Sequence, residues 1–331
     1  MTHLPASVTI LTNFMNYPDH VEPVAGYRVT LLKAETWSQV RKYLKHVDLV
    51  IIDCRDTLLY RLVAYLLLRP WLRVRLIAVD LVLRRPHRLR DQITRVIKQL
   101  LFRRVDHFIH YFKDISGYAL HFGIRAERSS YVPFKVNLAD VDVSRVDLRE
   151  DYIFTMGVSL RDYDTFIRAI ATLPYPAAIT AFSLENYEGR DRLSVWTKDN
   201  IPKNLTVLPD SGRREDLIRN LAKARMVVIP TQSSSLCASG ISSYLTAMHF
   251  GKCVITTMGP GASDVLVDQA LFVRPHDVEA LARTIRSAWE DDALRRRVAE
   301  TGRSYAKSLG GEQELLQRIL VRSLETIPAM P

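Results

Sequence analysis

Cysteine is scarce in this chain. Its 331 residues contain three cysteines, Cys54, Cys237 and Cys253, which lie far apart and form no CxxC pair. A disulfide framework or a structural zinc site requires cysteines in paired or closely spaced sets. We therefore expect reduced, mostly buried thiols in a cytosolic protein, with no metal and no other cofactor.

Long hydrophobic runs and dinucleotide motifs are also missing. No window reaches the roughly 20 apolar residues that a membrane-spanning helix needs, and residues 1–10 lack the basic start of a secretory signal. No GxGxxG follows any expected strand, which argues against a dinucleotide-dependent oxidoreductase. The sequence thus favours a cytoplasmic location.

Acidic residues are few in one segment, and this accounts for the charge of the whole chain. Between Arg55 and Arg104 the sequence carries thirteen Lys and Arg but only three acids, Asp56, Asp80 and Asp91. This excess equals the formal net charge of +10, so the rest of the chain is balanced. A single basic region, rather than a basic protein, has to be explained.

Apolar runs typical of strands alternate with helical patterns along the chain. Its 331 residues exceed the roughly 250–300 that one core accommodates, so two domains are expected. Near-continuous apolar strands between helices indicate parallel sheets covered on both faces. The expected strands are 8–12, 27–32, 48–53, 74–83, 107–112, 130–133, 152–156, 177–182, 205–208, 226–230 and 253–257. The expected helices are 37–46, 87–104, 163–173, 215–224 and 242–250, with helices dominating from residue 278 onward.

Residues 137–151 interrupt the alternation. This stretch is polar, rich in Asp and Arg, and its valines are isolated. We interpret it as an interdomain linker. The chain then divides into an N-terminal domain over 1–140, a C-terminal domain over 151–311, and a last helix over 312–331 that packs back toward the N-terminal domain.

The segment 227–257 carries the most informative pattern. An expected strand leads into the small polar loop 231–243, and a helix and a second strand follow. Small residues before a helix let the backbone approach a ligand, and the unpaired N–H groups at a helix start attract anions. Gly240 permits the turn, and Ser242 or Ser243 caps the helix or donates a hydroxyl to a phosphate.

An ordered set of segments resembles glycosyltransferase family 4 and its GT-B relatives. Residues 246–257, TAMHFGKCVITT, resemble the family's EAMAxGKPVIAT, and 271–282, LFVRPHDVEALA, resemble GxLVxPxDxEALAxAI. Residues 292–303 are similar to its closing DxxLRxRLxxxGR helices. Residues 152–157 and 161–167 resemble the first strand and helix of its donor domain. The resemblance covers about 151–324.

This resemblance implies an α/β protein of the GT-B fold, with two Rossmann-like domains facing each other across a cleft. It also implies that the C-terminal domain binds a nucleotide-sugar donor. Carried over by position, Arg161 and the turn at Gly240, Ile241, Ser242 and Ser243 hold the donor diphosphate. A guanidinium suits phosphate because it binds bidentately and stays charged. A solvated arginine at the start of a helix is the alternative.

The sequence departs from the family pattern at the donor sugar. The family's Glu-x7-Glu pair aligns with Ala238 and Thr246, so both carboxylates are absent. Thr246 retains a hydroxyl for a ribose, and Leu208 lies where the family's base-contacting loop begins. In the N-terminal domain, residues 12–16 replace the family's glycine-rich loop and offer polar side chains to the cleft. The stereochemical course and the sugar stay open.

Asp80 is the best single candidate for acid–base work. It follows the apolar run 76–79 and is expected at the carboxyl edge of a parallel strand, where ligands bind in open α/β sheets. A partly desolvated carboxylate there can deprotonate an acceptor hydroxyl. The alternative is an Asp that caps a loop. His87, His107 and His110 are weaker candidates, since each is more often a surface or core histidine.

The basic segment 55–104 has two interpretations. Leu89, Ile93, Val96, Ile97 and Leu100 recur at helical spacing among arginines, which is typical of a helix that docks on anionic lipid at the inner face of the cell membrane. The alternative is a helix that covers the sheet and turns a solvated basic face outward.

Three functions of different class remain. The first is a hexosyltransferase that moves sugar from a nucleotide-sugar donor to a lipid-linked or surface-polysaccharide acceptor. The second is a non-catalytic GT-B relative that binds a partner, which the missing glutamates allow. The third is a nucleic-acid-binding protein, suggested by a pI of about 9.5, but no nucleic-acid motif accompanies the charge.

Overall fold

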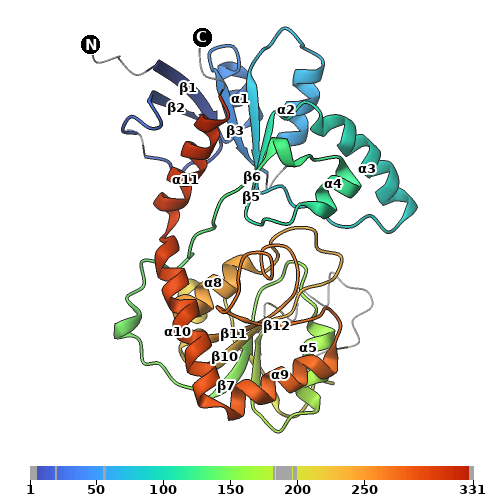
Figure 1. The fold of residues 1–331 in the computed structure, drawn as a ribbon, viewed down its shortest axis with the longest axis vertical. Helices are drawn as coiled ribbons and strands as arrows, with labels where there is room; N and C mark the ends of the chain where they lie inside the picture. The colour runs from blue at the N-terminus through green and yellow to red at the C-terminus, as the bar shows by residue number, and fades with distance from the viewer. Residues whose placement is uncertain are drawn as a thin grey trace. The chain divides into compact units, whose positions relative to one another are not determined.

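The chain folds into two units, Met1–Pro133 with Glu312–Pro331, and Phe134–Gly311. The computed structural model, shown as a ribbon in Figure 1, describes residues 6–18, 21–54, 57–181, 183, 196 and 200–327. Within these residues, no helix is long and apolar enough to cross a bilayer. Each unit is built on its own parallel sheet.

The first unit contains six described strands in the order β2-β1-β3-β4-β5-β6, all parallel. They are β1 (Ala6–Thr12), β2 (Tyr27–Lys33), β3 (Leu49–Asp53), β4 (Arg75–Val79), β5 (His107–His110) and β6 (Ser129–Tyr131). Its helices are α1 (Trp37–Tyr43), α2 (Leu58–Leu67), α3 (Leu89–Phe102), α4 (Ser116–Phe122) and α11 (Glu312–Glu325). The expected strand 74–83 is shorter than predicted, because the backbone turns at Asp80 with a positive φ of 55°.

Helix α11 returns to the first unit after the chain has completed the second. Five of its apolar side chains are almost fully buried: Leu315, Leu316, Ile319, Leu320 and Leu324. The hydroxyl of Tyr17 donates to the carbonyl of Leu316 at 3.0 Å, and the Arg318 Nε donates to the carbonyl of Pro133 at 3.2 Å. The last helix therefore belongs to the core of the first unit.

The second unit has the strand order β12-β11-β10-β7-β8-β9, also parallel. Its strands are β7 (Tyr152–Thr155), β8 (Ala177–Thr180), β9 (Leu205–Leu208), β10 (Ala224–Ile229), β11 (Cys253–Thr257) and β12 (Leu271–Val273). Its helices are α5 (Tyr163–Ala171), α7 (Arg214–Ala222), α8 (Ile241–His249), α9 (Val278–Glu290) and α10 (Asp292–Leu309). The expected strand 177–182 ends at Thr180, and Phe182 lies outside the described residues.

Alternating residues of the second sheet feed two separate cores. Ile153, Met226 and Val228 belong to a cluster that includes side chains of α5 and α9. Their neighbours Phe154 and Val227 belong to another cluster, with side chains of α8 and α10. Because successive strand residues point to opposite faces, both faces of this sheet are covered.

The polar segment 137–151 is not a free linker. Val136, Leu138 and Val143 are at most 6% exposed and belong to the second core of the C-terminal unit. The boundary between the units falls earlier, between Pro133 and Phe134. The local pattern does not reveal this burial, because each of these side chains packs onto helices and strands from other parts of the chain.

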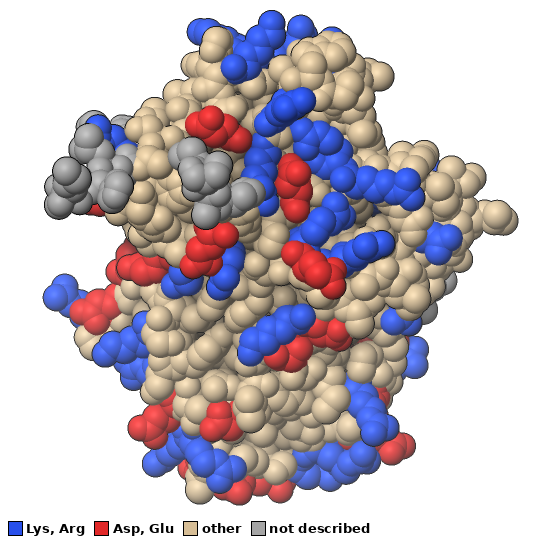
Figure 2. Space-filling model, turned by 45° about the horizontal axis from the view of Figure 1, so that its top comes forward, with Lys and Arg blue, Asp and Glu red and all other residues tan. Residues whose placement is uncertain are grey.

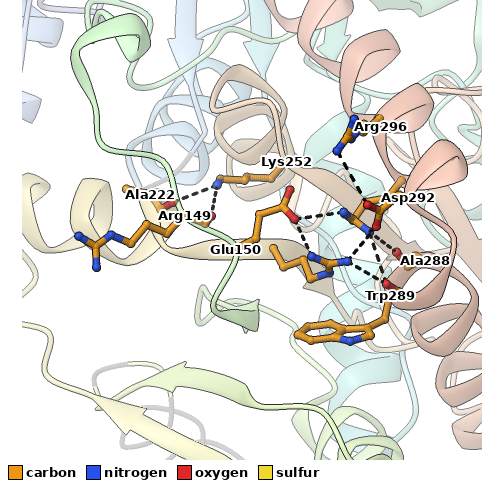
Figure 3. Close-up of polar contacts among 10 residues, drawn as sticks. Arg149, Glu150, Ala222, Lys252, Ala288, Trp289, Asp292 and Arg296 are labelled. Carbon is orange, nitrogen blue, oxygen red and sulfur yellow. Dashed lines mark hydrogen bonds and ion pairs between the residues drawn. The ribbon is translucent and has the colours of Figure 1, made fainter.

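A charged network fastens the end of this segment to the rest of the unit (Figure 3). The Glu150 carboxylate accepts from Arg225 at 2.6 Å and from Arg295 at 3.1 Å. The same two guanidiniums donate to Asp292 at 2.9 and 2.6 Å. Arg295 is 3% exposed, whereas the Glu150 and Asp292 side chains are 51% and 56% exposed, so the network joins the entry to β7 to the start of α10 with its carboxylates at the surface.

Lys252 lies near this network. It directly precedes β11 in the sequence and is buried. Its ammonium donates to the carbonyls of Arg149 and Ala222, at 3.1 and 3.0 Å (Figure 3). Burial lowers the pKa of the Lys252 ammonium to about 8. The lysine of the family-like Gly-Lys pair is thus a structural residue in this protein.

We predict that Lys252 makes stability rise with pH in the alkaline range. The folded pKa is about 8 against an ordinary 10.5, so between these values the unfolded chain binds more protons than the folded one. We compare the free energy of unfolding of the wild type with that of Lys252→Met. The wild-type value minus the variant value should increase by about 1 kcal/mol from pH ~7.5 to ~9.5, because solvent partly screens the buried ammonium and reduces the effect. Urea unfolding measures this difference. The exposed Lys223→Met is the control for loss of one charge, and a difference that stays flat would contradict the assignment.

Candidate functional site

The strand order of the second sheet reverses between β7 and β10. The chain runs from β7 outward to β8 and β9 on one side, then returns to β10 and runs outward to β11 and β12 on the other. At such a reversal the connecting loops diverge and leave a crevice outside the carboxyl ends of the strands, where ligands bind in open α/β sheets. The two loops at this point are 156–162, after β7, and 230–240, after β10.

Backbone hydrogen bonds join these two loops. The amide of Asp162 donates to the carbonyl of Pro230 at 3.1 Å, and the amide of Gln232 donates to the carbonyl of Leu160 at 2.9 Å. The Gln232 side chain adds a bond to the carbonyl of Arg161 at 3.1 Å. The loops therefore form one short two-stranded connection, with Arg161 opposite Thr231.

Arg161 lies inside this connection and is 4% exposed. Its Nε donates to the carbonyl of Met156 at 3.0 Å, and its Nη1 donates to the carbonyl of Ser159 at 3.0 Å. Its Nη2 donates to the hydroxyl oxygen of Ser243 at 2.9 Å. Burial lowers the pKa of the Arg161 guanidinium, but an arginine keeps its proton in proteins. A buried positive charge thus links the end of β7 to the first turn of α8.

Two glycines make room for this guanidinium. Gly157 has φ 97°, and a Cβ there would lie 2.9 Å from the Arg161 Cζ. Gly240 has φ 91°, and a Cβ there would lie 2.7 Å from the Ile229 Cγ2 and 3.5 Å from the Arg161 Nη1. Both positions need glycine for backbone conformation and for space.

The first turn of α8 presents hydrogen-bond donors beside this charge. Gly240 is its N-cap residue. The amide of Ile241 donates to the carbonyl of Ala238. Within the described residues, the amides of Ser242 and Ser243 donate to no backbone carbonyl. Because Arg161 donates to the Ser243 oxygen, the hydroxyl hydrogen of Ser243 stays available to an acceptor. Helix dipole, amides and hydroxyl together favour an anion.

The serine-rich loop before Gly240 is held by its own side chains. The Ser235 hydroxyl contacts the Ser239 hydroxyl at 2.7 Å and donates to the carbonyl of Cys237 at 3.0 Å. The amide of Ser239 donates to the same carbonyl at 2.7 Å. These bonds hold the approach to α8 in a defined conformation.

A second polar cluster lies at the same ends of the strands, and the sequence analysis gave its histidine no role. The His276 Nδ1 contacts the Asp162 Oδ2 at 2.9 Å, and its Nε2 contacts the Ser233 hydroxyl at 2.8 Å. Asp162 also caps α5 through the amide of Thr165. Three loops, after β7, β10 and β12, thus meet at one imidazole. The available signal was the position of His276, directly before the helix cap Asp277.

The structure brings together only part of the residues proposed for the donor. Arg161, Gly240, Ile241, Ser242 and Ser243 lie together. Arg161 is neither a solvated helix-start residue nor a freely exposed phosphate ligand, because its guanidinium is buried and bonded to two carbonyls and a hydroxyl.

The two residues proposed for ribose or base are placed differently. Thr246 is 2% exposed, and its hydroxyl donates to the carbonyl of Ser242 at 2.6 Å, so a ribose would reach it only after that bond breaks. Leu208 is partly buried at the carboxyl end of β9, the outer strand of the sheet and two strands from β7.

Asp80 follows β4 in the first unit, at the carboxyl edge of that sheet. Its amide donates to the carbonyl of Ile109 at 3.0 Å, and its backbone has a positive φ of 55°, which Asp tolerates better than most residues. At the same edge, the Asn13 side chain exchanges two hydrogen bonds with the backbone of Asp53, at 2.7 and 3.1 Å. Asn13 therefore clamps β1 to β3 rather than standing free.

The histidines near Asp80 in sequence are core residues. His107 is buried and its Nε2 contacts the Ser130 hydroxyl at 2.8 Å, and burial lowers its pKa to about 4. His110 is buried among Phe108, Phe112 and Tyr118, and burial lowers its pKa to about 3. Both are neutral near pH 7, whereas His87 is exposed.

Metal ligands do not gather in the part of the chain that the structure describes. No group of three or more His, Cys, Asp or Glu side chains there is suited to hold an ion. The site is built from amides, hydroxyls and one guanidinium instead.

Residues 146–305 match the family model of the glycosyl transferases group 1. This span coincides with most of the second unit, which is thus similar to the glycosyl transferases group 1. No curated protein matches the chain in sequence.

Solved structures match the chain over nearly its whole length, at low identity. Sucrose-phosphate synthase from Thermosynechococcus elongatus is 16% identical with a TM-score of 0.64, and the match covers 97% of this chain and 89% of that one. Anabaena Alr3699/HepE, solved with UDP-glucose, is 14% identical with a TM-score of 0.65, over 97% and 100%. A glycosyltransferase from Rickettsia africae ESF-5 is 12% identical with a TM-score of 0.62, over 91% and 86%. These matches confirm the predicted GT-B class of α/β fold with two Rossmann-like units.

We predict that Gly157→Ala destabilises the protein more than Gly212→Ala does. Gly212 has a similar positive φ of 75° but no atom within 4 Å of an added Cβ, so it reports the backbone strain alone, about 1–2 kcal/mol. Gly157→Ala also displaces the Arg161 guanidinium from buried carbonyls, which should cost roughly 2 kcal/mol more. Urea unfolding of both variants provides the comparison. Equal losses would show that Arg161 moves aside freely.

Proposed function

We propose that the protein is a glycosyltransferase that uses a nucleotide-sugar donor, with the first turn of α8 holding the donor diphosphate. The observation that carries the proposal is the pairing of that turn with buried Arg161 at the point where the strand order reverses. The group 1 match over 146–305 supports glycosyl transfer. The Anabaena protein of the same fold was solved with UDP-glucose, which supports a nucleotide-sugar donor.

In this proposal the residues of the site have distinct tasks. The amides of Ser242 and Ser243 bind phosphate oxygens directly, and Ser243 adds its hydroxyl. Arg161 does not grip the phosphate itself but orients the Ser243 hydroxyl and supplies a positive charge behind it. Positive charge at this point stabilises the nucleoside diphosphate as it leaves with the electrons of the glycosidic bond.

We further propose a hexose as the transferred sugar and a lipid-linked or surface-polysaccharide glycan as the acceptor. Asp80 takes the proton of the acceptor hydroxyl. Its place at the carboxyl edge of the first sheet and its partial burial support this role. The three cysteines are free thiols, which suits the reducing cytoplasm where we place the reaction.

Neutral residues at the donor sugar distinguish this site from the family pattern. Ala238 and Thr246 occupy the positions of the two family carboxylates, and the Thr246 hydroxyl is already bonded to the backbone. The donor sugar is therefore held without a carboxylate from either position. A non-catalytic binding protein would share the diphosphate site but show no turnover, so activity on bound donor separates the two functions.

We predict that nucleoside diphosphates raise the melting temperature and that the corresponding nucleosides do not. A panel of UDP, GDP, ADP and dTDP, together with the corresponding nucleotide sugars, identifies the preferred base. A ligand present at about 100 times its Kd adds roughly 2.7 kcal/mol to the free energy of unfolding. Ser243→Ala should weaken the preferred diphosphate about tenfold, as loss of one charged hydrogen bond does. Arg161→Ala should abolish the shift.

Ser304→Ala, at an exposed serine of α10, is the matched control and should respond as the wild type does. A normal response from Ser243→Ala would contradict diphosphate binding at this turn. Arg161→Ala is interpreted only if its melting temperature without ligand shows that it folds.

We predict that Asp80→Asn keeps donor binding and loses turnover by at least ~10²-fold, the usual worth of a general base. Asn tolerates the positive φ at this position, so the backbone should be retained. Release of nucleoside diphosphate from the preferred donor measures turnover, and the thermal shift measures binding. Glu127→Gln, an exposed carboxylate of the same unit, should behave as the wild type. Normal turnover by Asp80→Asn would exclude it as the base.

A further inference from the structure

Helix α3 of the first unit turns its apolar side outward. Leu89 is 84% exposed, Ile93 63%, Val96 48%, Ile97 52% and Leu100 51%. These positions share one face of a helix, since they recur at intervals of three and four residues. Of the fourteen residues of α3, only Phe102 is buried. A buried sheet-covering helix, the alternative for segment 55–104, describes α2 with its five buried apolar residues and does not describe α3.

Polar contacts fix this orientation. The Gln92 Nε2 donates to the carbonyl of Pro86 at 3.4 Å, and the Gln99 Nε2 donates to the carbonyl of His121 at 3.0 Å. The ammonium of Lys98 lies 5.6 Å from the centre of the Tyr60 ring, and burial lowers its pKa. The helix therefore rests on the unit by its polar side and cannot roll to bury the stripe without losing these contacts.

The stripe lies within a strongly basic stretch. Residues 84–104 contain eight Lys and Arg and one acid, Asp91. Asp91 accepts hydrogen bonds from the amides of Arg88 and His87, at 2.9 and 3.3 Å, so it serves as a helix cap. Arg84, Arg85, Arg88, Arg90 and Arg103 are exposed. On the face drawn in Figure 2, Lys and Arg side chains gather in the upper part of the view, with a few Asp and Glu among them.

The exposed apolar stripe and the arginines around it together indicate which kind of partner binds this surface. A second copy of the chain would bring two basic stretches together across the stripe, and like charges there oppose association. A nucleic acid would neutralise the arginines but leave the apolar stripe in water. An anionic bilayer accommodates both, because apolar side chains enter the acyl boundary while arginines reach the headgroups.

We propose that α3 docks the first unit on an anionic lipid bilayer, with the stripe Leu89, Ile93, Val96, Ile97 and Leu100 inserted and the flanking arginines on lipid phosphates. The docked helix lies in the plane of the interface. The inference does not depend on the donor chemistry proposed above, since it rests on a different unit and on different residues.

Flotation with vesicles tests the proposal on the full chain. The wild type should float with phosphatidylcholine vesicles that contain about a third phosphatidylglycerol, and at least tenfold less with phosphatidylcholine alone. Ile93→Glu with Ile97→Glu should lower binding to the anionic vesicles at least tenfold. Gln317→Glu with Ser304→Glu adds the same two charges at exposed positions of α11 and α10 and should bind as the wild type does.

Each possible result of these measurements either supports or contradicts docking through α3. Since Ile93 and Ile97 are exposed, their variant should keep the wild-type melting temperature and the response to nucleoside diphosphate, which separates docking from folding and from donor binding. Equal flotation of the two double variants would overturn the role of the stripe. Stripe-dependent self-association in sedimentation velocity, or retention on oligonucleotides without vesicle binding, would assign the surface to another occupant and overturn the proposal.

Discussion

The buried guanidinium of Arg161 is the interaction on which the second unit depends at its reversal point. It bonds to the carbonyls of Met156 and Ser159 and to the Ser243 hydroxyl, so it joins the turn after β7 to the first turn of α8. A guanidinium buried there requires hydrogen-bond acceptors around its N–H groups, since an unsatisfied buried charge is costly. The glycine at 157 follows from it, because a Cβ there would occupy the space of the guanidinium, whereas a Cβ at 240 would clash with Ile229.

The same constraint explains how a neutral loop forms an anion site. The serine loop contributes hydroxyls and amides but no cation of its own, and the positive charge is supplied from behind. An arginine in this place cannot swing away, so the donors are oriented before a ligand arrives. Preorganised donors lower the cost of binding and stabilise charge that develops during the reaction. At the reversal point of the first sheet, the neutral amide of Asn13 joins the end of β1 to the end of β3.

Much of this architecture follows from the sequence, and the exceptions have physical causes. The eleven expected strands and the turn at Gly240 are present, because apolar runs and small residues before a helix are local signals; 74–83 and 177–182 are shorter than expected, and β12 was not predicted. Three features required knowledge of packing: the burial of Arg161, the outward stripe of α3, and the burial of 136–143. In each case tertiary contacts decide which side of a segment faces the core, and the pattern alone fits either side. The sequence does not predict the contacts of His276, because its partners, Asp162 and Ser233, lie in loops that are distant along the chain.

The most direct measurement is a crystal structure of the full chain with the nucleoside diphosphate that gives the largest thermal shift. The account predicts phosphate oxygens within hydrogen-bonding distance of the amides of Ser242 and Ser243 and of the Ser243 hydroxyl, with Arg161 unmoved behind them. A diphosphate bound at the end of any other strand, or one that draws Arg161 out of its carbonyl cage to contact phosphate directly, would contradict it.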